Sequence, residues 1–151
     1  MKNFKLSRLF AAAALVACLA FTSCKPAEDL AQTIITTTQN TYQSLLSGKW
    51  RSQYNDGYTI GGGLMIYDDG GYGFGWTRAI AEITSDYIYT FDASGKYYAV
   101  AYKGYTGVSC KFSNAYKTGG KTFANSLLEA KIEFTKDNGY YGYYGDYIKA
   151  Q

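Results

Sequence analysis

Cysteine has the most reactive side chain in this sequence, but the chain contains no histidine that could activate it. A catalytic thiol needs a neighbouring base or cation that stabilises the thiolate. Cys110 lies in the alternating stretch 108–112, in which Val108, Cys110 and Phe112 share one face of a strand. The sequence therefore predicts that Cys110 is a buried and inert thiol.

Paired carboxylates could carry catalysis without histidine, because two of them can hydrolyse a glycosidic bond. Glu82, Asp86 and Asp92 are the acids nearest to the ends of predicted strands. Their spacing selects no pair, and acids at such positions are usually solvated. The lack of histidine also excludes Ser/His/Asp, Cys/His and histidine-based metal sites. We expect a protein that is not an enzyme, has no catalytic residue and needs no cofactor.

Oxygen-rich clusters that could bind calcium occur three times, at residues 55–57, 68–70 and 137–139. None has the spaced carboxylates and distant Glu of a calcium loop, whereas Asp-Gly and Asn-Gly are favoured in hairpin turns. The glycine-rich stretch 70–75 is not followed by the Lys-Ser/Thr or the helix of a phosphate-binding loop. These motifs predict turns and a glycine-kinked strand, and no metal site.

Aromatic density is the most unusual feature of the composition, with 17 Tyr, 8 Phe and 2 Trp. The interior of a small domain cannot hold all of these rings, so some must be exposed or line a groove. Exposed aromatic side chains often mark a binding surface. The alternative is that the rings pack sideways on a two-sided sheet. The candidate ligand-binding residues are Trp50, Tyr72, Trp76, Tyr97, Tyr141 and Tyr144.

The first residues of the chain have the features of a secretory signal peptide. Lys2, Lys5 and Arg8 form a basic start, and residues 9–23 form an apolar run that ends in small polar residues. The run is shorter than the roughly 20 apolar residues of a membrane-spanning helix. A buried core helix is the alternative, but no acid or cap marks the segment. We expect residues 1–23 to be removed.

The segment Phe21-Thr22-Ser23-Cys24 resembles the end of bacterial lipoprotein signals, in which a cysteine after one large and two small residues becomes diacylated. The resemblance implies that Cys24 carries the lipid and anchors the chain to a membrane. The segment 15–18, which ends in Cys18, also fits the pattern, but cleavage there would leave an apolar mature start. Lys25 follows the anchor in place of the Asp that retains such proteins in the inner membrane, so the expected location is the outer membrane or cell surface.

Cleavage before Cys24 changes the charge of the chain. The full sequence has 15 basic and 12 acidic residues, and the signal removes three bases and no acid, which leaves 12 of each. The positive patch that nucleic-acid binding requires is therefore not expected. With Cys18 removed and Cys24 acylated, Cys110 has no partner for an intramolecular disulfide.

The pattern of the mature chain predicts a mainly β domain with two helices. Apolar residues at helical spacing and Pro26 predict a helix over about 28–46, and Ser126 with Glu129 has the spacing of a capping box for a helix over about 124–134. Alternating segments separated by Gly, Asn and Asp predict about seven antiparallel strands, which form a small sheet or barrel. These strands are expected at 50–54, 58–67, 72–83, 87–91, 96–103, around 108–112, and 140–148.

Gly48-Lys49-Trp50, at the junction of the first helix and the first strand, resembles the Gly-x-Trp start of lipocalins and related small ligand-binding barrels. In that family the Trp closes the floor of the barrel, so the resemblance implies a similar place for Trp50. The family's Thr-Asp-Tyr loop and late Arg have no counterpart at a suitable spacing. We divide the chain into a signal peptide (1–23), a lipidated tether with a helix (24–48) and a β-rich domain (49–151).

Two functions fit these features. One is a non-enzymatic envelope lipoprotein that binds a small apolar ligand or a glycan through a Tyr- and Trp-rich surface or barrel mouth. The other is a structural or adhesive surface lipoprotein that docks on a protein partner. In both cases the membrane is contacted through the N-terminal lipid.

Overall fold

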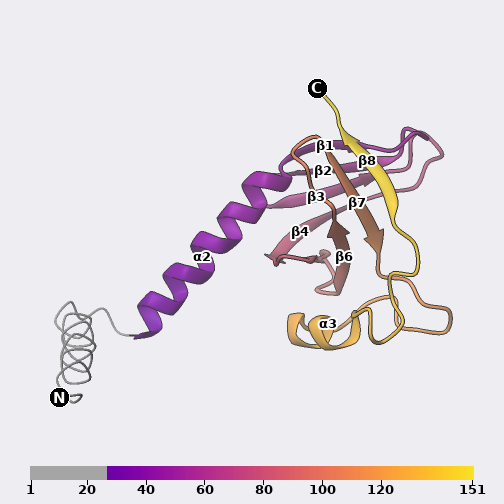
Figure 1. Ribbon diagram of the computed structural model, residues 1–151. Coiled ribbons are helices and arrows are strands. Elements are labelled where there is room, and N and C mark those ends of the chain that lie inside the picture. Colours follow the sequence, from indigo (N-terminus) through magenta and orange to yellow (C-terminus); the bar gives the residue numbers. More distant parts are fainter. Residues whose placement is uncertain (1–26) are drawn as a thin grey trace, which may run out of the picture. The chain divides into compact units, whose positions relative to one another are not determined.

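The computed structural model describes residues 27–151, which form a closed antiparallel barrel with two helices (Figure 1). The expected signal peptide and the expected lipidation residue Cys24 lie outside the described residues. Contacts divide the chain between Thr37 and Thr38, and the unit Thr38–Gln151 contains the whole barrel. The elements are α2 (Ala27–Leu46), β1 (Gly48–Arg51), β2 (Gly57–Gly61), β3 (Leu64–Asp68), β4 (Gly75–Ile83), β5 (Tyr87–Phe91), β6 (Tyr97–Lys103), β7 (Ser109–Asn114), α3 (Leu127–Glu133) and β8 (Gly145–Lys149).

Each strand pairs with the next one along the chain, and β8 returns to pair with β1. This meander confirms the predicted mainly β fold and shows that the sheet is closed. The two ends of the barrel follow from the connections. The β2–β3, β4–β5 and β6–β7 turns lie at the end where α2 enters β1, and the other loops lie at the opposite end, which we call the open end.

The structure has eight strands rather than about seven, because the predicted strand 58–67 is a hairpin. β2 and β3 pair in register from Gly57↔Asp68 to Gly61↔Leu64, which leaves Gly62 and Gly63 as a two-residue turn. Both turn residues have positive φ, at 58° and 75°. Tight hairpins require such angles, and glycine adopts them without steric cost. Gly62 and Gly63 therefore reverse the chain, and the glycine run does not bend a single strand.

Alternate side chains of the strands point into the barrel and fill it. Trp50, Met65, Ile88 and Val100 are fully buried, and rings from β2, β7 and β8 pack among them. The core consists of Leu46, Trp50, Tyr58, Ile60, Met65, Ile83, Ile88, Val100, Tyr102, Cys110, Phe112 and Tyr147.

The last turn of α2 packs on the barrel where the chain enters β1. Leu46 is buried in the core and Tyr42 packs against it. The indole N–H of Trp50 donates to the Leu46 carbonyl at 2.7 Å, which satisfies one of the acceptors left free at a helix end. Within residues 27–151, neither helix is long and apolar enough to cross a membrane.

The second helix, α3, packs on the outer face of β5 and β6 with a second cluster of buried residues. The predicted capping box is present, since the backbone N–H of Glu129 donates to Ser126 Oγ at 3.1 Å. The helix begins later than predicted because Ala124 is in a β bridge. Its backbone exchanges two hydrogen bonds with Tyr97, at 2.8 and 2.9 Å.

Candidate functional site

Two neighbouring cavities lie at the open end of the barrel and share Asn114, the last residue of β7. The larger, of about 510 Å³, has Tyr58, Phe112 and Tyr147 among its lining residues. The smaller, of about 210 Å³, is lined partly by Trp76, which faces the barrel interior from β4. Core rings thus form part of the cavity walls.

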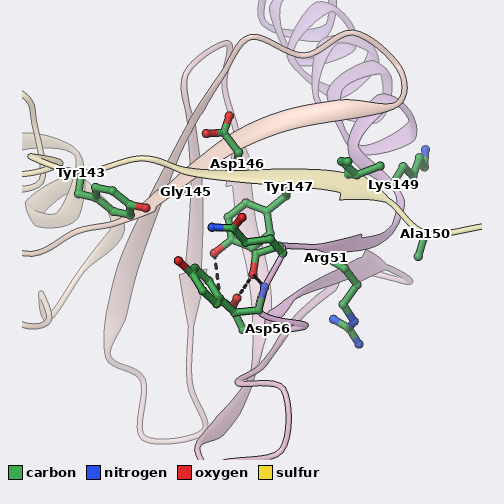
Figure 2. Close-up of a pocket in the computed structure, with 12 residues that line it drawn as sticks. Arg51, Asp56, Tyr143, Gly145, Asp146, Tyr147, Lys149 and Ala150 are labelled. Atoms are coloured by element: carbon green, nitrogen blue, oxygen red, sulfur yellow. Dashed lines mark hydrogen bonds between the residues drawn. The ribbon is translucent and has the colours of Figure 1, made fainter.

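A third cavity, of about 700 Å³, lies beside β8, where the barrel closes (Figure 2). The β1–β8 ladder has only two register pairs, Trp50↔Lys149 and Arg51↔Ile148, whereas the β2–β3 ladder has five. The first part of β8, Gly145–Tyr147, is therefore not paired with β1, and the β1–β2 loop borders the space beside it. Tyr147 lines both this cavity and the 510 Å³ cavity.

Asp56 connects several segments at the β1–β8 closure through hydrogen bonds. Its Oδ2 accepts a hydrogen bond from the hydroxyl of Tyr147 at 3.2 Å (Figure 2). The same oxygen accepts one from the hydroxyl of Tyr67 at 3.3 Å, and Oδ1 accepts one from the hydroxyl of Ser52. The tyrosines come from β3 and β8, so one carboxylate joins three segments of the barrel. Burial and the nearby Asp56 charge raise the pKa of both tyrosines, which keeps their hydroxyls protonated as donors.

The floor of the open end is aromatic. The Tyr58 ring centroid lies 5.1 Å from that of Phe112, 5.3 Å from Tyr147 and 5.2 Å from Tyr67. Tyr67 in turn stacks on Trp76 at 5.8 Å with an interplanar angle of 27°. These are the offset and tilted arrangements that aromatic pairs prefer. Tyr58 is buried and Trp76 is half-buried, so the edge of the cluster reaches the cavities.

Arg78 contacts two rings at the smaller cavity. Its Cζ is 4.2 Å from the Trp76 ring centroid and 3.3 Å from that of Tyr98. The Tyr98 hydroxyl donates to Asp92 at 2.8 Å, which fixes the ring. Hydrogen bonds from Ser94 and Tyr98 hold the pKa of Asp92 below its usual range, so this carboxylate stays ionised.

Exposed aromatic side chains surround the same end. All of the strongly exposed aromatic residues of the described chain lie in the β1–β2, β3–β4 and β7–β8 loops, which belong to the open end. We call this set the aromatic rim. It consists of Tyr54, Tyr72, Phe74, Tyr116 and Tyr143, which are 72–81 % exposed.

The β3–β4 loop that carries part of the rim is held in one shape. The Asp69 carboxylate accepts hydrogen bonds from the backbone N–H groups of Gly71, Tyr72 and Phe74. Gly70 approaches the backbone of the β1–β2 loop so closely that a Cβ there would lie 3.0 Å from Tyr54 O. Tyr72 and Phe74 are therefore exposed on a loop that hydrogen bonds hold in one shape, next to the loop of Tyr54.

The structure separates the six aromatic residues that the sequence suggested for ligand binding. Trp76 lies at the cavities and Tyr72 on the rim. Trp50 is fully buried at the α2 end. Tyr97, Tyr141 and Tyr144 belong to the outer cluster beneath α3, where Tyr141 has a φ of 65°.

The sequence did not indicate the other residues that surround the cavities at the open end. Arg78 could have been noticed because it occupies an interior position, two residues after Trp76 in an alternating strand. Asp56 was interpreted as a turn residue. Its bond to Tyr147 spans 91 residues, so no local pattern indicates it. The other residues that were not selected are Tyr58, Tyr67, Tyr98, Asn114, Lys117 and Tyr147.

The thiol and the carboxylates that could have carried catalysis do not line the three cavities. Cys110 is buried, as predicted, and burial raises the pKa of its thiol to about 11. Glu82 forms an ion pair with Lys131 at 2.5 Å, and Asp86 accepts a hydrogen bond from Ser85 at 2.8 Å. Within residues 27–151 no three His, Cys, Asp or Glu side chains group so that they could hold a metal ion.

The fold and this site define a small closed antiparallel barrel with a filled interior and an aromatic, polar-lined open end. Comparisons with protein-family models, curated proteins and solved structures found no match to the chain.

Proposed function

We propose that the chain is a non-enzymatic envelope lipoprotein whose barrel binds a saccharide at its open end. The observation that carries the proposal is the 510 Å³ cavity, where Tyr58, Tyr147 and Asn114 bring aromatic rings, hydroxyls and an amide together. A sugar presents both apolar C–H faces and a ring of hydroxyls. Sites that combine rings with a few directed polar groups recognise such amphipathic ligands.

The filled interior favours a saccharide over an apolar ligand. A lipid-like molecule would need space deep in the barrel, but Trp50, Met65 and Val100 occupy that space and are fully buried. The cavities that exist are open to solvent at the barrel end, and they present hydroxyl, amide and charged groups. A ligand held there keeps part of its surface in water, which suits a polar sugar better than an acyl chain.

Placement at a membrane rests on the sequence. The lipoprotein-like signal and Cys24 give the proposed anchor, with the outer membrane or cell surface as the proposed location. β1 begins directly after α2, so the chain enters the barrel at the end opposite the cavities.

Titration of the full chain, purified from membranes in detergent, against a panel of oligosaccharides tests the function. We expect a change in tryptophan fluorescence and measurable binding heat with at least one glycan, because Trp76 lies at the cavities. Trp76→Leu should weaken binding about 10-fold or more, because truncation of an aromatic ring that packs against a ligand typically costs this much affinity. Ile66→Ala, on the outer face of β3, is the control and should bind normally. Absence of binding by every glycan would refute the proposal.

A second function is favoured by the aromatic rim. Exposed Tyr and Phe on a loop held by hydrogen bonds are typical of protein interfaces, where rings are enriched. In this case the rim docks on a protein partner at the cell surface. Cross-linking in intact cells should then capture one stoichiometric partner, and the double variant Tyr72→Ser, Phe74→Ser should release it while saccharide binding is retained.

A further inference from the structure

The arrangement of Arg78 leaves its hydrogen-bonding groups available. The rings of Trp76 and Tyr98 lie over the guanidinium at 4.2 and 3.3 Å from its Cζ. A cation–π contact does not use the N–H donors of the guanidinium. Arg78 lines the 210 Å³ cavity together with Asn114. The two rings therefore hold a hydrogen-bond donor group at the wall of a cavity.

Arg78 forms none of the ion pairs of residues 27–151. The ion pairs of residues 27–151 are Arg51–Asp68, Lys111–Asp146, Lys121–Glu129 and Lys131–Glu82, and no hydrogen bond to the Arg78 guanidinium occurs in the same part of the chain. Asp92 attracts Arg78 electrostatically, but its carboxylate accepts hydrogen bonds from Tyr98, Ser94 and Lys96 instead. A half-buried guanidinium stays charged and has lost part of its hydration, so an incoming anion gains more from it than from an exposed cation.

The charged side chains that line the two neighbouring cavities have one sign. Lys117 lines the larger cavity and Arg78 the smaller, and the described residues that line them include no Asp or Glu. The Lys117 ammonium donates to the carbonyl of Asn138 at 2.7 Å, so its charge is not neutralised by an acid. The 700 Å³ cavity on the other side of Tyr147 differs, because Asp56 and Asp146 line it. The charged groups that line these two cavities are thus cations, while Asp92 and Asp56 lie behind the lining residues Tyr98 and Tyr147, from whose hydroxyls they accept hydrogen bonds.

We propose that the bound saccharide is acidic, and that Arg78 binds its carboxylate or sulfate while the neighbouring rings contact the sugar. This inference rests on the proposed function and narrows it to one class of glycan. Arginine suits the role because its fork of donors matches a planar carboxylate or two oxygens of a sulfate. Lys117 adds a second positive charge at the neighbouring cavity and favours an oligosaccharide with repeated acidic units.

Paired glycans of equal shape and different charge test the inference. Oligogalacturonate, alginate and hyaluronan fragments are compared with their methyl-esterified neutral counterparts by calorimetry on the full chain. A chondroitin sulfate fragment, against its desulfated form, distinguishes sulfate from carboxylate. We expect at least one acidic member to bind about 10- to 100-fold more tightly than its neutral partner, the range for a charge-assisted hydrogen-bonding group.

Two substitutions assign the preference to Arg78. Arg78→Met keeps an unbranched chain against the rings and should abolish the difference between acidic and neutral partners, whereas Arg78→Lys should retain part of it. The matched control Lys111→Gln removes a cation from the outer face of β7 and should leave the preference intact. Circular dichroism and thermal unfolding establish that each variant is folded.

The possible outcomes separate this inference from the function on which it rests. Equal binding of acidic and neutral partners by the unaltered chain, or an acidic preference that persists in a folded Arg78→Met variant, overturns the role of Arg78 and leaves saccharide binding standing. Failure of both members of every pair to bind overturns the inference, and it overturns the proposed function too only when the whole oligosaccharide panel also fails to bind.

Discussion

At the scale of single residues, the open end depends on carboxylates that accept hydrogen bonds from their own loop or from other strands of the barrel. Asp56 receives three hydroxyl donors, and Asp69 and Asp92 each cap a loop through several backbone N–H groups. Carboxylates in such positions define loop shape, because each accepted N–H bond fixes one backbone direction. The same residue types that looked like calcium ligands in the sequence therefore build the loops around the cavities.

Removing the charge of Asp56 should destabilise the barrel. Asp56→Asn replaces the ionised acceptor of the Tyr67 and Tyr147 hydroxyls and leaves these half-buried donors poorly satisfied. We expect the free energy of unfolding to fall by about 1–3 kcal/mol in urea titrations. Asp68→Asn is the control, since it breaks an exposed ion pair with Arg51 and should cost less than about 1 kcal/mol. Equal losses for the two variants would contradict the role given to Asp56.

Burial should make the Cys110 thiol unreactive. Its pKa is raised to about 11, above the ordinary value of about 8.5, so near pH 8 the thiolate fraction falls by about 100-fold or more. In the mature chain expected from cleavage before Cys24, it is the one free thiol. A disulfide reagent at pH 8 should label it slowly in the native protein and at once in denaturant. Rapid native labelling would show that the β6–β7 side opens.

The raised pKa of Cys110 predicts that the free energy of unfolding decreases at alkaline pH. The native state keeps the Cys110 proton to a higher pH than the unfolded chain, so its contribution is complete below about pH 8.5 and is lost as the pH rises to about 11. Cys110→Ala should therefore flatten the alkaline part of the stability profile, measured as the urea midpoint from pH 7 to 10. If the urea midpoint of the unaltered protein rose from pH 7 to 10, this result would be inconsistent with a buried thiol.

At the scale of elements, the positions of most strands could be predicted because alternation and turn residues are local signals. The strand predicted at 87–91 is β5 as observed, and the predicted first helix differs from α2 by one residue at its start. The errors occur where a local pattern has two interpretations. Gly61 to Gly63 suit a bulge as well as a turn, and only the pairing of β2 with β3 decides between them.

The β2–β3 turn offers a matched pair of substitutions. Gly62 has a φ of 58°, where a Cβ is strained, whereas Gly61 has ordinary strand geometry, and a Cβ at either position meets no other atom within 4 Å. Gly62→Ala should lower the unfolding free energy by about 1–2 kcal/mol, while Gly61→Ala should change it little or raise it slightly. Urea titration of both variants measures the difference, and indistinguishable midpoints would argue against a tight turn at Gly62.

At the scale of the whole molecule, the candidate site could not be predicted because barrel closure creates it. β8 returns to β1 only at the end of the chain, and this return places Tyr147 beside Asp56. The sequence indicates that aromatic residues are too many for the interior, but not which of them face inward at the open end. Trp50 and Trp76 belong to one row of register partners that runs through Tyr58 and Tyr67, yet the Trp50 indole bonds to Leu46 at the α2 end and Trp76 lines a cavity at the open end.

The proposed placement of the molecule depends on a single acylated residue. If the chain is processed as its signal suggests, Cys24→Ser should abolish incorporation of an alkyne-labelled fatty acid and leave the protein unanchored, whereas Cys18→Ser should be acylated normally because Cys18 lies within the removed segment. Intact-mass measurement of the two variants and the unaltered chain identifies the modified residue. Acylation that persists in Cys24→Ser but not in Cys18→Ser would move the anchor to Cys18. It would also leave Leu19, Ala20 and Phe21 at the mature start, an apolar addition to the tether that precedes α2.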